Sequence, residues 1–119
     1  KIPLLKQLGV EMVEQPLAKD NWDGMKTLFD QSALPLYADE ACVFEADVEK
    51  CHQHFHGINI KLTKSSGITP ARRMISRARE VDMDGPLLLN EDTAAGVGFE
   101  NGKIIYTPTA GLGITVEPF

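Results

Sequence analysis

The feature that most constrains the fold of this chain is a regular alternation of short apolar runs with longer amphipathic segments. Four such runs, at 10–14, 34–39, 57–62 and 81–84, each carry charged residues at or near their ends. Their length, their apolar and β-branched content and the flanking Pro and Gly residues predict strands. The charged ends of the first three runs lie 25 and 22 residues apart, which fits repeated strand–helix units.

The segments between these runs have the apolar spacing of helices. Asp20 is a candidate cap for the second of them, and Thr69 followed by Pro70 is a candidate start for the last. We therefore expect helices over 1–8, 22–29, 46–55 and 71–80. Strands that alternate with helices predict an α/β fold in which a parallel sheet carries helices on its outer side.

The pattern changes after residue 89. Asn101 and Gly102 stand between two short apolar runs at 98–100 and 103–106. An Asn-Gly pair in this position predicts a β-hairpin with a type I′ turn. The remaining residues, from Gly111 on, indicate a terminal tail.

The charge of the chain excludes several classes of partner. It has 12 Lys and Arg against 17 Asp and Glu, a net charge of −5, which argues against nucleic acids and anionic membranes. No apolar run approaches the roughly 18 residues of a membrane-spanning helix. Cys42 and Cys51 do not make a disulfide framework, and the first residues do not resemble a signal peptide, so we expect a cytoplasmic protein.

Chemically useful side chains stand at the ends of the four predicted strands. Because side chains alternate along a strand, one common region receives Glu14, Asp39, Lys61, Asp82 and Asp84. The carboxyl ends of parallel strands are where α/β folds bind ligands. Two carboxylates from neighbouring strands supply half of a Mg²⁺ site, and a nearby lysine can act as a general base. Strand-end ion pairs explain the same residues equally well at this point.

Several motifs resemble the enolase superfamily. V-E-Q-P-L at 13–17, Y-A-D-E at 37–40 and I-N-I-K-L-T-K at 58–64 look like its barrel strands four, five and six, and the muconate-lactonizing subgroup is the most similar. Within that subgroup, V-D-M-D-G-P at 81–86 and G-L-G-I-T at 111–115 resemble dipeptide epimerases. The similarity extends over essentially the whole chain.

The resemblance implies a fold and a set of roles. The fold is the C-terminal portion of a (β/α)7β TIM-like barrel with a C-terminal hairpin tail. Residues 1–119 hold strands four, five, six and eight, without the N-terminal capping domain. Glu14 and Asp39 would bind Mg²⁺, Lys61 would be the acid/base, and Asp82 and Asp84 would bind the substrate's α-ammonium group.

The activity implied is that of an isomerase, a Mg²⁺-dependent dipeptide epimerase that abstracts an α-proton next to a metal-bound carboxylate. Its expected partner is a small dipeptide, with L-Ala-D/L-Glu as the leading candidate. Assembly into a homo-oligomer is a further possibility. Alternatives within the subgroup are a cycloisomerase, an N-succinylamino acid racemase and an o-succinylbenzoate synthase. A non-catalytic barrel fragment is the alternative outside it.

The chain also departs from the resemblance. A (β/α)8 barrel takes about 250 residues, whereas this sequence has 119. The first metal-ligand Asp and the opposite-face lysine of the family would lie in earlier strands. The resemblance also implies a βα unit between Glu80 and Val81 that this sequence lacks. If the sequence joins ordered pieces of a longer chain, the Cα atoms of these two residues should lie much more than about 3.8 Å apart; we prefer this explanation to a genuine 119-residue polypeptide.

Two further groups invite a functional interpretation. His52 and His56 are four residues apart in a predicted helix, a spacing that suits Zn²⁺, although a polar helix end is the favoured explanation. Lys64 lies beyond Leu62 in the loop after the third strand. We interpret it as a loop charge or a substrate contact, and we favour Lys61 as the base.

Overall fold

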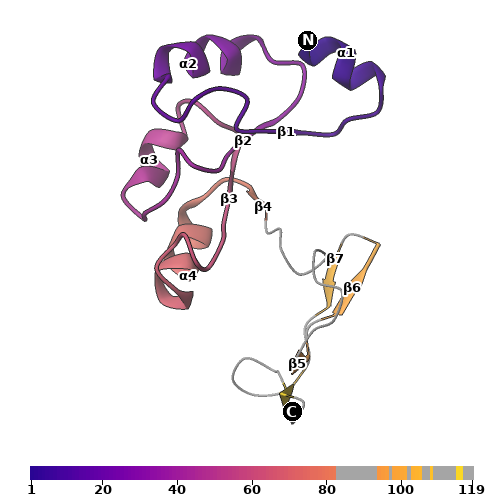
Figure 1. The fold of residues 1–119 in the computed structure, drawn as a ribbon, viewed down its shortest axis with the longest axis vertical. Coiled ribbons are helices and arrows are strands. Elements are labelled where there is room, and N and C mark those ends of the chain that lie inside the picture. Colours follow the sequence, from indigo (N-terminus) through magenta and orange to yellow (C-terminus); the bar gives the residue numbers. More distant parts are fainter. Residues whose placement is uncertain (83–93, 97, 102, 106–107, 109–114, 117–119) are drawn as a thin grey trace. The chain divides into compact units, whose positions relative to one another are not determined.

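The computed structural model describes residues 1–82, 94–96, 98–101, 103–105, 108 and 115–116. The chain divides into two compact units, Lys1–Gly85 and Pro86–Phe119 (Figure 1). Each unit is described by itself.

The N-terminal unit is built on a four-stranded parallel sheet. Its strands β1 (Val13–Glu14), β2 (Leu36–Ala38), β3 (Gly57–Asn59) and β4 (Val81–Asp82) lie side by side in chain order. The predicted parallel sheet is therefore confirmed. The strands are shorter than the predicted apolar runs, which begin before β1 and β2, at residues 10 and 34, and extend beyond β3 to residue 62.

Four helices accompany the sheet: α1 (Ile2–Gln7), α2 (Trp22–Gln31), α3 (Asp47–Cys51) and α4 (Ile68–Arg77). The N-cap of α2 is Asn21, whose side chain accepts from the Gly24 amide, and not Asp20 as expected. α4 begins at Ile68 after Gly67 at φ 105°, so Thr69 is not its cap. Pro70 is tolerated because the first turn of a helix needs no amide donor at that position.

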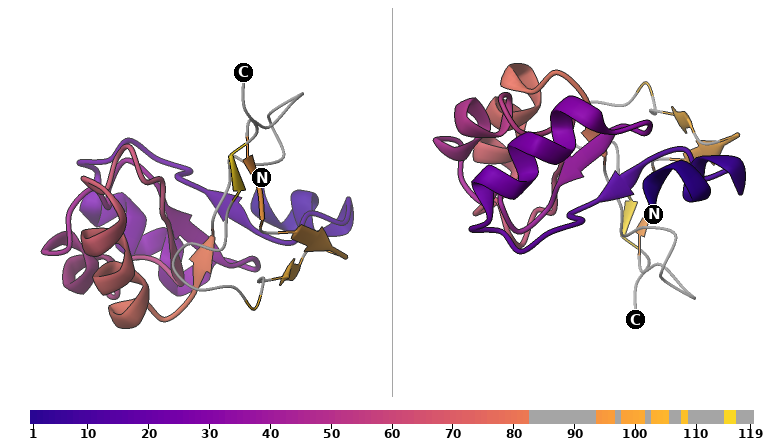
Figure 2. Two further views of the ribbon diagram at one scale, coloured as in Figure 1. Left: turned by 90° about the horizontal axis from the view of Figure 1, so that it is seen from below. Right: turned by 90° about the horizontal axis from the view of Figure 1, so that it is seen from above.

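The core lies between one face of the sheet and helices α2, α3 and α4, which lie together along that face (Figure 2). The strands contribute Leu36, Ala38 and Ile58, which are buried. Alternation along the strands therefore leaves Tyr37, Gly57 and Asn59 on the opposite face. The buried members of the core are Met25, Leu36, Ala38, Ala41, Cys42, Val48, Cys51, Phe55, Ile58, Ile60, Ala71 and Met74.

The opposite face of the sheet depends on a close approach between Tyr37 and Gly57. A Cβ atom at Gly57 would lie 2.5 Å from Tyr37 Cε1, so a larger residue does not fit there. The Tyr37 hydroxyl donates to Glu80 Oε2 at 2.6 Å. Burial, together with the hydrogen bond to Glu80 and its charge, raises the pKa of Tyr37 to about 12.

The chain runs directly from Glu80 into β4. The amide of Ile58 donates to Glu80 O at 3.0 Å, and the amide of Ile60 donates to Asp82 O at 2.9 Å. These bonds continue the pairing of β3 with β4, in which Asn59 and Asp82 are register partners.

The C-terminal unit contains two antiparallel pairs. β5 (Ala94–Ala95) pairs with β8 (Thr115–Val116), and β6 (Gly98–Glu100) pairs with β7 (Lys103–Ile105). Glu100 is the partner of Lys103, and Asn101 has a φ of 50°. The predicted hairpin is confirmed, with its left-handed turn residue where a type I′ turn requires one. Among the residues that the structure describes, no helix combines the length and apolarity needed to cross a membrane.

Candidate active site

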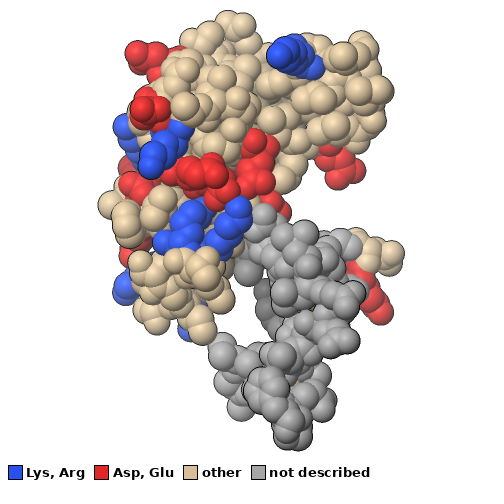
Figure 3. Space-filling view, in the orientation of Figure 1, with Lys and Arg blue, Asp and Glu red and all other residues tan. Residues whose placement is uncertain are grey.

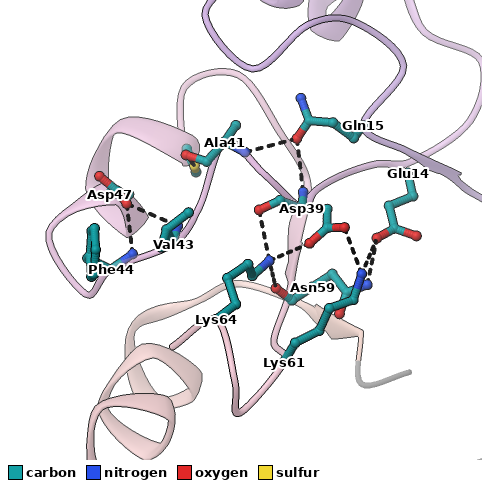
Figure 4. Close-up of polar contacts among 11 residues, drawn as sticks. Glu14, Gln15, Asp39, Ala41, Val43, Phe44, Asp47, Asn59, Lys61 and Lys64 are labelled. Atoms are coloured by element: carbon teal, nitrogen blue, oxygen red, sulfur yellow. Dashed lines mark hydrogen bonds and ion pairs between the residues drawn. The ribbon is translucent and has the colours of Figure 1, made fainter. Parts of the chain in front are cut away.

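The carboxyl ends of β1, β2 and β3 bring three of the predicted site residues together. Glu14 is the last residue of β1, Asp39 follows β2, and Lys61 lies two residues beyond β3. Lys61 Nζ donates to Asp39 Oδ2 at 2.7 Å and lies 3.6 Å from Glu14 Oε1 (Figure 4). A single cationic group therefore sits within reach of both carboxylates.

Lys64 reaches the same place through a turn. The amides of Lys64 and Ser65 both donate to Lys61 O, at 3.0 and 2.9 Å, which forms a helical turn just after β3. Residues three apart in such a turn lie on the same side, so Lys64 lies beside Lys61. Its ammonium donates to Asp39 Oδ1 at 2.5 Å, to Asp39 O at 2.8 Å and to Asn59 O at 2.9 Å. Lys64 therefore lies in the loop after β3, as expected, but its three contacts with Asp39 and Asn59 were not foreseen.

Asn59 connects the third strand to the first. Its side chain is fully buried, and Nδ2 donates to Glu14 Oε1 at 2.6 Å. The other amide atom, Oδ1, is buried and has no hydrogen-bond partner. Alternation along the strand puts Asn59 on the same face as Lys61, but no pattern in the sequence indicates a contact with Glu14.

Gln15 fixes the loop that carries Asp39. Its side-chain oxygen accepts from the amides of Asp39 at 3.0 Å and Ala41 at 3.2 Å, and its Nε2 donates to Leu17 O at 2.9 Å. Gln15 itself has a φ of 36°, a left-handed conformation that non-glycine residues seldom adopt. This backbone conformation directs the side-chain amide of Gln15 toward the end of β2. The V-E-Q-P motif was the available signal for Gln15, but its task depends on the position of β2.

The charged side chains at these strand ends form a cluster in which positive and negative charges balance. Two carboxylates, Glu14 and Asp39, face two ammonium groups, Lys61 and Lys64, and acidic and basic side chains adjoin on the surface in Figure 3. Burial acts to raise the pKa of Asp39, but the hydrogen bonds and charges of Lys61 and Lys64 outweigh burial and hold that pKa below its ordinary value. Asp39 is therefore ionised at neutral pH, with both lysines as its cationic partners.

Of the two aspartates expected to bind an ammonium group, the structure describes one. Asp82 ends β4 and is the register partner of Asn59, so it stands one strand away from the cluster at the same level of the sheet. Its side chain is partly exposed. Asp84 lies outside the described residues.

The histidines do not form a metal site. α3 ends at Cys51, so His52 and His56 do not share a helix. His56 Nδ1 accepts from the Leu36 amide at 3.1 Å, and its ring packs against Phe29. No cluster of three or more His, Cys, Asp and Glu side chains that could hold a metal occurs within the described part of the chain.

A divalent cation nevertheless fits the donors at the strand ends. Carboxylate oxygens are the ligands that Mg²⁺ prefers, and Glu14 and Asp39 already share the Lys61 ammonium as a cationic neighbour. These two residues supply a minority of the six ligands of an octahedral Mg²⁺ ion. The remaining positions have to come from water, from a substrate and from other residues.

A comparison with protein-family models identifies the family to which this chain belongs. The model for enolase C-terminal domain-like proteins matches residues 2–90. The chain is 43% identical to an L-Ala-D/L-amino acid epimerase from Flavobacterium johnsoniae, over 94% of this chain and 42% of that protein. It therefore spans less than half the length of this curated relative. The alignment extends over 141 residues, more than the 119 of this chain, so the relative has residues with no counterpart here.

Solved structures of similar fold include two epimerases. The L-Ala-D/L-Glu epimerase from Bacillus subtilis, in a substrate-liganded complex, has a TM-score of 0.77 at 24% identity and is matched over 99% of this chain and 44% of that one. The dipeptide epimerase from Enterococcus faecalis, in complex with Mg and the dipeptide L-Leu-L-Tyr, has a TM-score of 0.63 at 28% identity, over 69% of this chain and 25% of that one. The first similarity shows the α/β barrel fold of the N-terminal unit's sheet and helices.

Proposed function

The chain belongs to the family of enolase C-terminal domain-like proteins, and from this premise we propose that it forms part of a Mg²⁺-dependent dipeptide epimerase. The observation that carries the proposal is the convergence of Glu14 and Asp39 on one cationic group, at 3.6 and 2.7 Å from Lys61 Nζ. The names of its relatives support it: the Flavobacterium johnsoniae protein is named an L-Ala-D/L-amino acid epimerase, and the Enterococcus faecalis dipeptide epimerase structure is complexed with Mg and a dipeptide.

Glu14 and Asp39 are the proposed metal ligands. Asp39 is nearly buried and Glu14 is about one-third exposed, so the pair lies at the boundary between the sheet and the open end of the strands. A bound Mg²⁺ would stabilise the negative charge that builds up on a substrate carboxylate as its α-proton is removed. Asn59 and Gln15 support these ligands, since one donates to the Glu14 carboxylate and the other holds the Asp39 backbone.

Lys61 is the proposed acid/base. In its neutral form the amine takes the α-proton of the substrate, and the resulting ammonium can return a proton to the same face. Its side chain is 34% exposed, against 14% for Lys64, so Lys61 is the more accessible of the two to a substrate at the strand ends. Inversion also requires a proton donor on the opposite face, and the resemblance places that lysine in earlier strands of the barrel.

Asp82 is the proposed contact for the α-ammonium group of a dipeptide, with Asp84 as its partner in the D-x-D motif. A carboxylate and an ammonium form a charge-assisted hydrogen bond, which substrates without a free ammonium do not gain. Cycloisomerase, N-succinylamino acid racemase and o-succinylbenzoate synthase substrates belong to that second group. We therefore propose that the substrate is a dipeptide, with L-Ala-D/L-Glu as the leading candidate. We also propose a cytoplasmic location.

The proposal is tested by exchange of the substrate α-hydrogen. The intact protein that carries this sequence is incubated with L-Ala-L-Glu in D₂O, and the α-proton signal of the C-terminal residue is followed by NMR. We expect the signal to decrease only in the presence of Mg²⁺, while the second diastereomer forms. Both changes should stop when EDTA removes the metal. Exchange that continues without any divalent cation would overturn the metal role.

The same assay separates the substrate classes. A panel of dipeptides is compared with N-succinyl- and N-acetylamino acids, which lack the free ammonium group. Faster exchange with the dipeptides supports the role of Asp82, and D82N should raise KM for dipeptides while leaving the N-acyl substrates unaffected. If the N-acyl compounds exchange faster, the dipeptide assignment is wrong even though the reaction class stands.

A further inference from the structure

Asp39 has two lysine partners, and the structure gives them different surroundings. Lys64 Nζ binds Oδ1 at 2.5 Å, whereas Lys61 Nζ binds Oδ2 at 2.7 Å. Both ammonium groups therefore approach the same carboxylate at similar distances, one at each oxygen. A metal ion that coordinates Asp39 would bring a further positive charge to this carboxylate, so it competes with the two ammonium groups.

The bonding of Lys64 is complete. An ammonium group has three N–H donors, and Lys64 has three acceptors: Asp39 Oδ1, Asp39 O and Asn59 O. Two of these acceptors are backbone carbonyl oxygens, which keep their positions whatever happens to the Asp39 side chain. Moving Lys64 away would leave these two carbonyl oxygens without this donor. Because an unpaired buried polar group costs free energy, Lys64 is held in place.

Lys61 is placed for exchange. Its side chain is 34% exposed, more than twice the fraction of Lys64, and its ammonium also lies 3.6 Å from Glu14 Oε1. It thus occupies the point at which the two proposed ligand carboxylates converge. A divalent cation at that point and the Lys61 ammonium exclude each other, both by volume and by like charge.

We propose that Lys64 is a positioning residue that holds Asp39 Oδ1 with and without the metal, whereas Lys61 holds Oδ2 only until a divalent cation takes its place. Lys64 in this way fixes the orientation of the ligand carboxylate and leaves one oxygen for coordination. Arrival of the cation releases Lys61 toward the substrate, so that metal binding and availability of the acid/base are coupled. The inference rests on the proposed cation site and deepens it.

Metal affinity distinguishes the two lysines. The probe is Mn²⁺, whose free concentration is followed by electron paramagnetic resonance in titrations of the intact protein, K61M and K64M. Removing the ammonium group that competes for the cation position should tighten Mn²⁺ binding by roughly tenfold or more, which we expect for K61M. K64M should gain less than K61M, because it also loses the hydrogen bonds that orient Asp39.

Simple charge screening predicts a different result. Since the two ammonium groups lie at nearly equal distances from Asp39, two equivalent screening charges would give equal gains in Mn²⁺ affinity. Equal gains, or a larger gain for K64M, would overturn the proposal. K26M is the matched control, because Lys26 pairs with Asp30 on the exposed surface of α2, where both side chains are about half exposed; its Mn²⁺ affinity should equal that of the parent.

A second measurement covers the case in which K64M does not fold. Proton–nitrogen NMR of the lysine ammonium groups, with signals assigned through K61R and K64R, is recorded before and after Mg²⁺ addition. We expect a slowly exchanging Lys64 signal in both states and a Lys61 signal that changes. Loss of the Lys64 signal on Mg²⁺ addition contradicts the proposal.

Failure of this inference differs from failure of the proposed function. If the parent protein and the variant E14Q/D39N bind Mn²⁺ equally, these carboxylates are not the cation site, and both proposals fall. If the parent binds Mn²⁺ through them but K64M and K61M respond alike, the distinction between the two lysines fails and the cation site stands.

Discussion

The side-chain amide of Asn59 donates a 2.6 Å hydrogen bond to the Glu14 carboxylate, although β2 lies between the strands that carry them. This bond crosses the sheet on the face opposite the helices, next to Asp39. Asn59 is fully buried, so the donor is held in one position. One side chain that does no chemistry of its own thereby orients a proposed metal ligand.

Replacing Asn59 with Asp should destabilise the protein. The variant N59D puts a second carboxylate in a buried position against Glu14, and like charges at short range with little water are costly. We expect a loss of about 2 kcal/mol or more at pH 7, measured by urea denaturation. N59T, which has a similar volume and no charge, should lose less, and equal losses would mean that charge repulsion is not the cause.

Replacing Gly57 with Ala should also be destabilising, for a steric reason. The new Cβ would lie 2.5 Å from Tyr37 Cε1, so the ring must move and the hydrogen bond from Tyr37 to Glu80 must lengthen. Overpacking of this kind costs about 1–3 kcal/mol. The double variant G57A/Y37A should show a smaller additional loss from G57A than the parent does. G98A is the control, since its Cβ would lie 3.9 Å from Ile105 Cβ, and its stability should change little.

Tyr37 should titrate at about pH 12, against an ordinary value near 10. Because burial and Glu80 favour the neutral phenol, the folded state binds the proton more tightly than the unfolded state. The stability that this proton contributes is fully present below pH 10 and is lost as the pH rises toward 12. Ultraviolet absorbance of tyrosinate, with Y37F as the reference, measures the titration. E80Q should lower the pKa of Tyr37, and an unchanged pKa would show that Glu80 does not contribute.

Replacing Lys61 with Arg should strongly reduce turnover while leaving the ion pair with Asp39 in place. A guanidinium keeps its positive charge and its contact with Asp39, but it does not give up a proton at neutral pH. We expect kcat for α-hydrogen exchange to fall by about 10²–10⁴-fold in the intact protein. Thermal unfolding should show that the fold is retained. Activity within a few-fold of the parent would remove Lys61 from the role of acid/base.

Replacing Asp39 with Asn should reduce metal binding and activity together. The change removes the carboxylate that two lysines and the proposed cation share, so Mg²⁺-dependent exchange should fall by about 10²-fold or more. D30N is the matched control: it makes the same substitution in the exposed Lys26–Asp30 pair, and such surface pairs contribute little. If excess Mg²⁺ has no effect on D39N and both variants keep full activity, Asp39 is not a ligand.

The strand–helix alternation and the strand-end charges were readable from the sequence because they depend on local patterns. Periods of two and 3.6 residues identify strands and helices, and the parallel order follows from the alternation of the two. Helix boundaries were less certain: α2 is capped by Asn21 and α4 begins at Ile68. Several groups compete for a helix start, and the surrounding packing decides among them.

The sequence by itself determined which residues stand at the ends of β1, β2 and β3, and hence that Glu14, Asp39 and Lys61 share one edge of a sheet. Only the tertiary structure decided how they are held. Lys64 reaches Asp39 because a turn replaces the last residues of the expected strand, and Asn59 reaches Glu14 because the strand registers place their side chains at bonding distance. Contacts between residues 25 and 45 positions apart depend on how whole strands align, and no local pattern encodes an alignment.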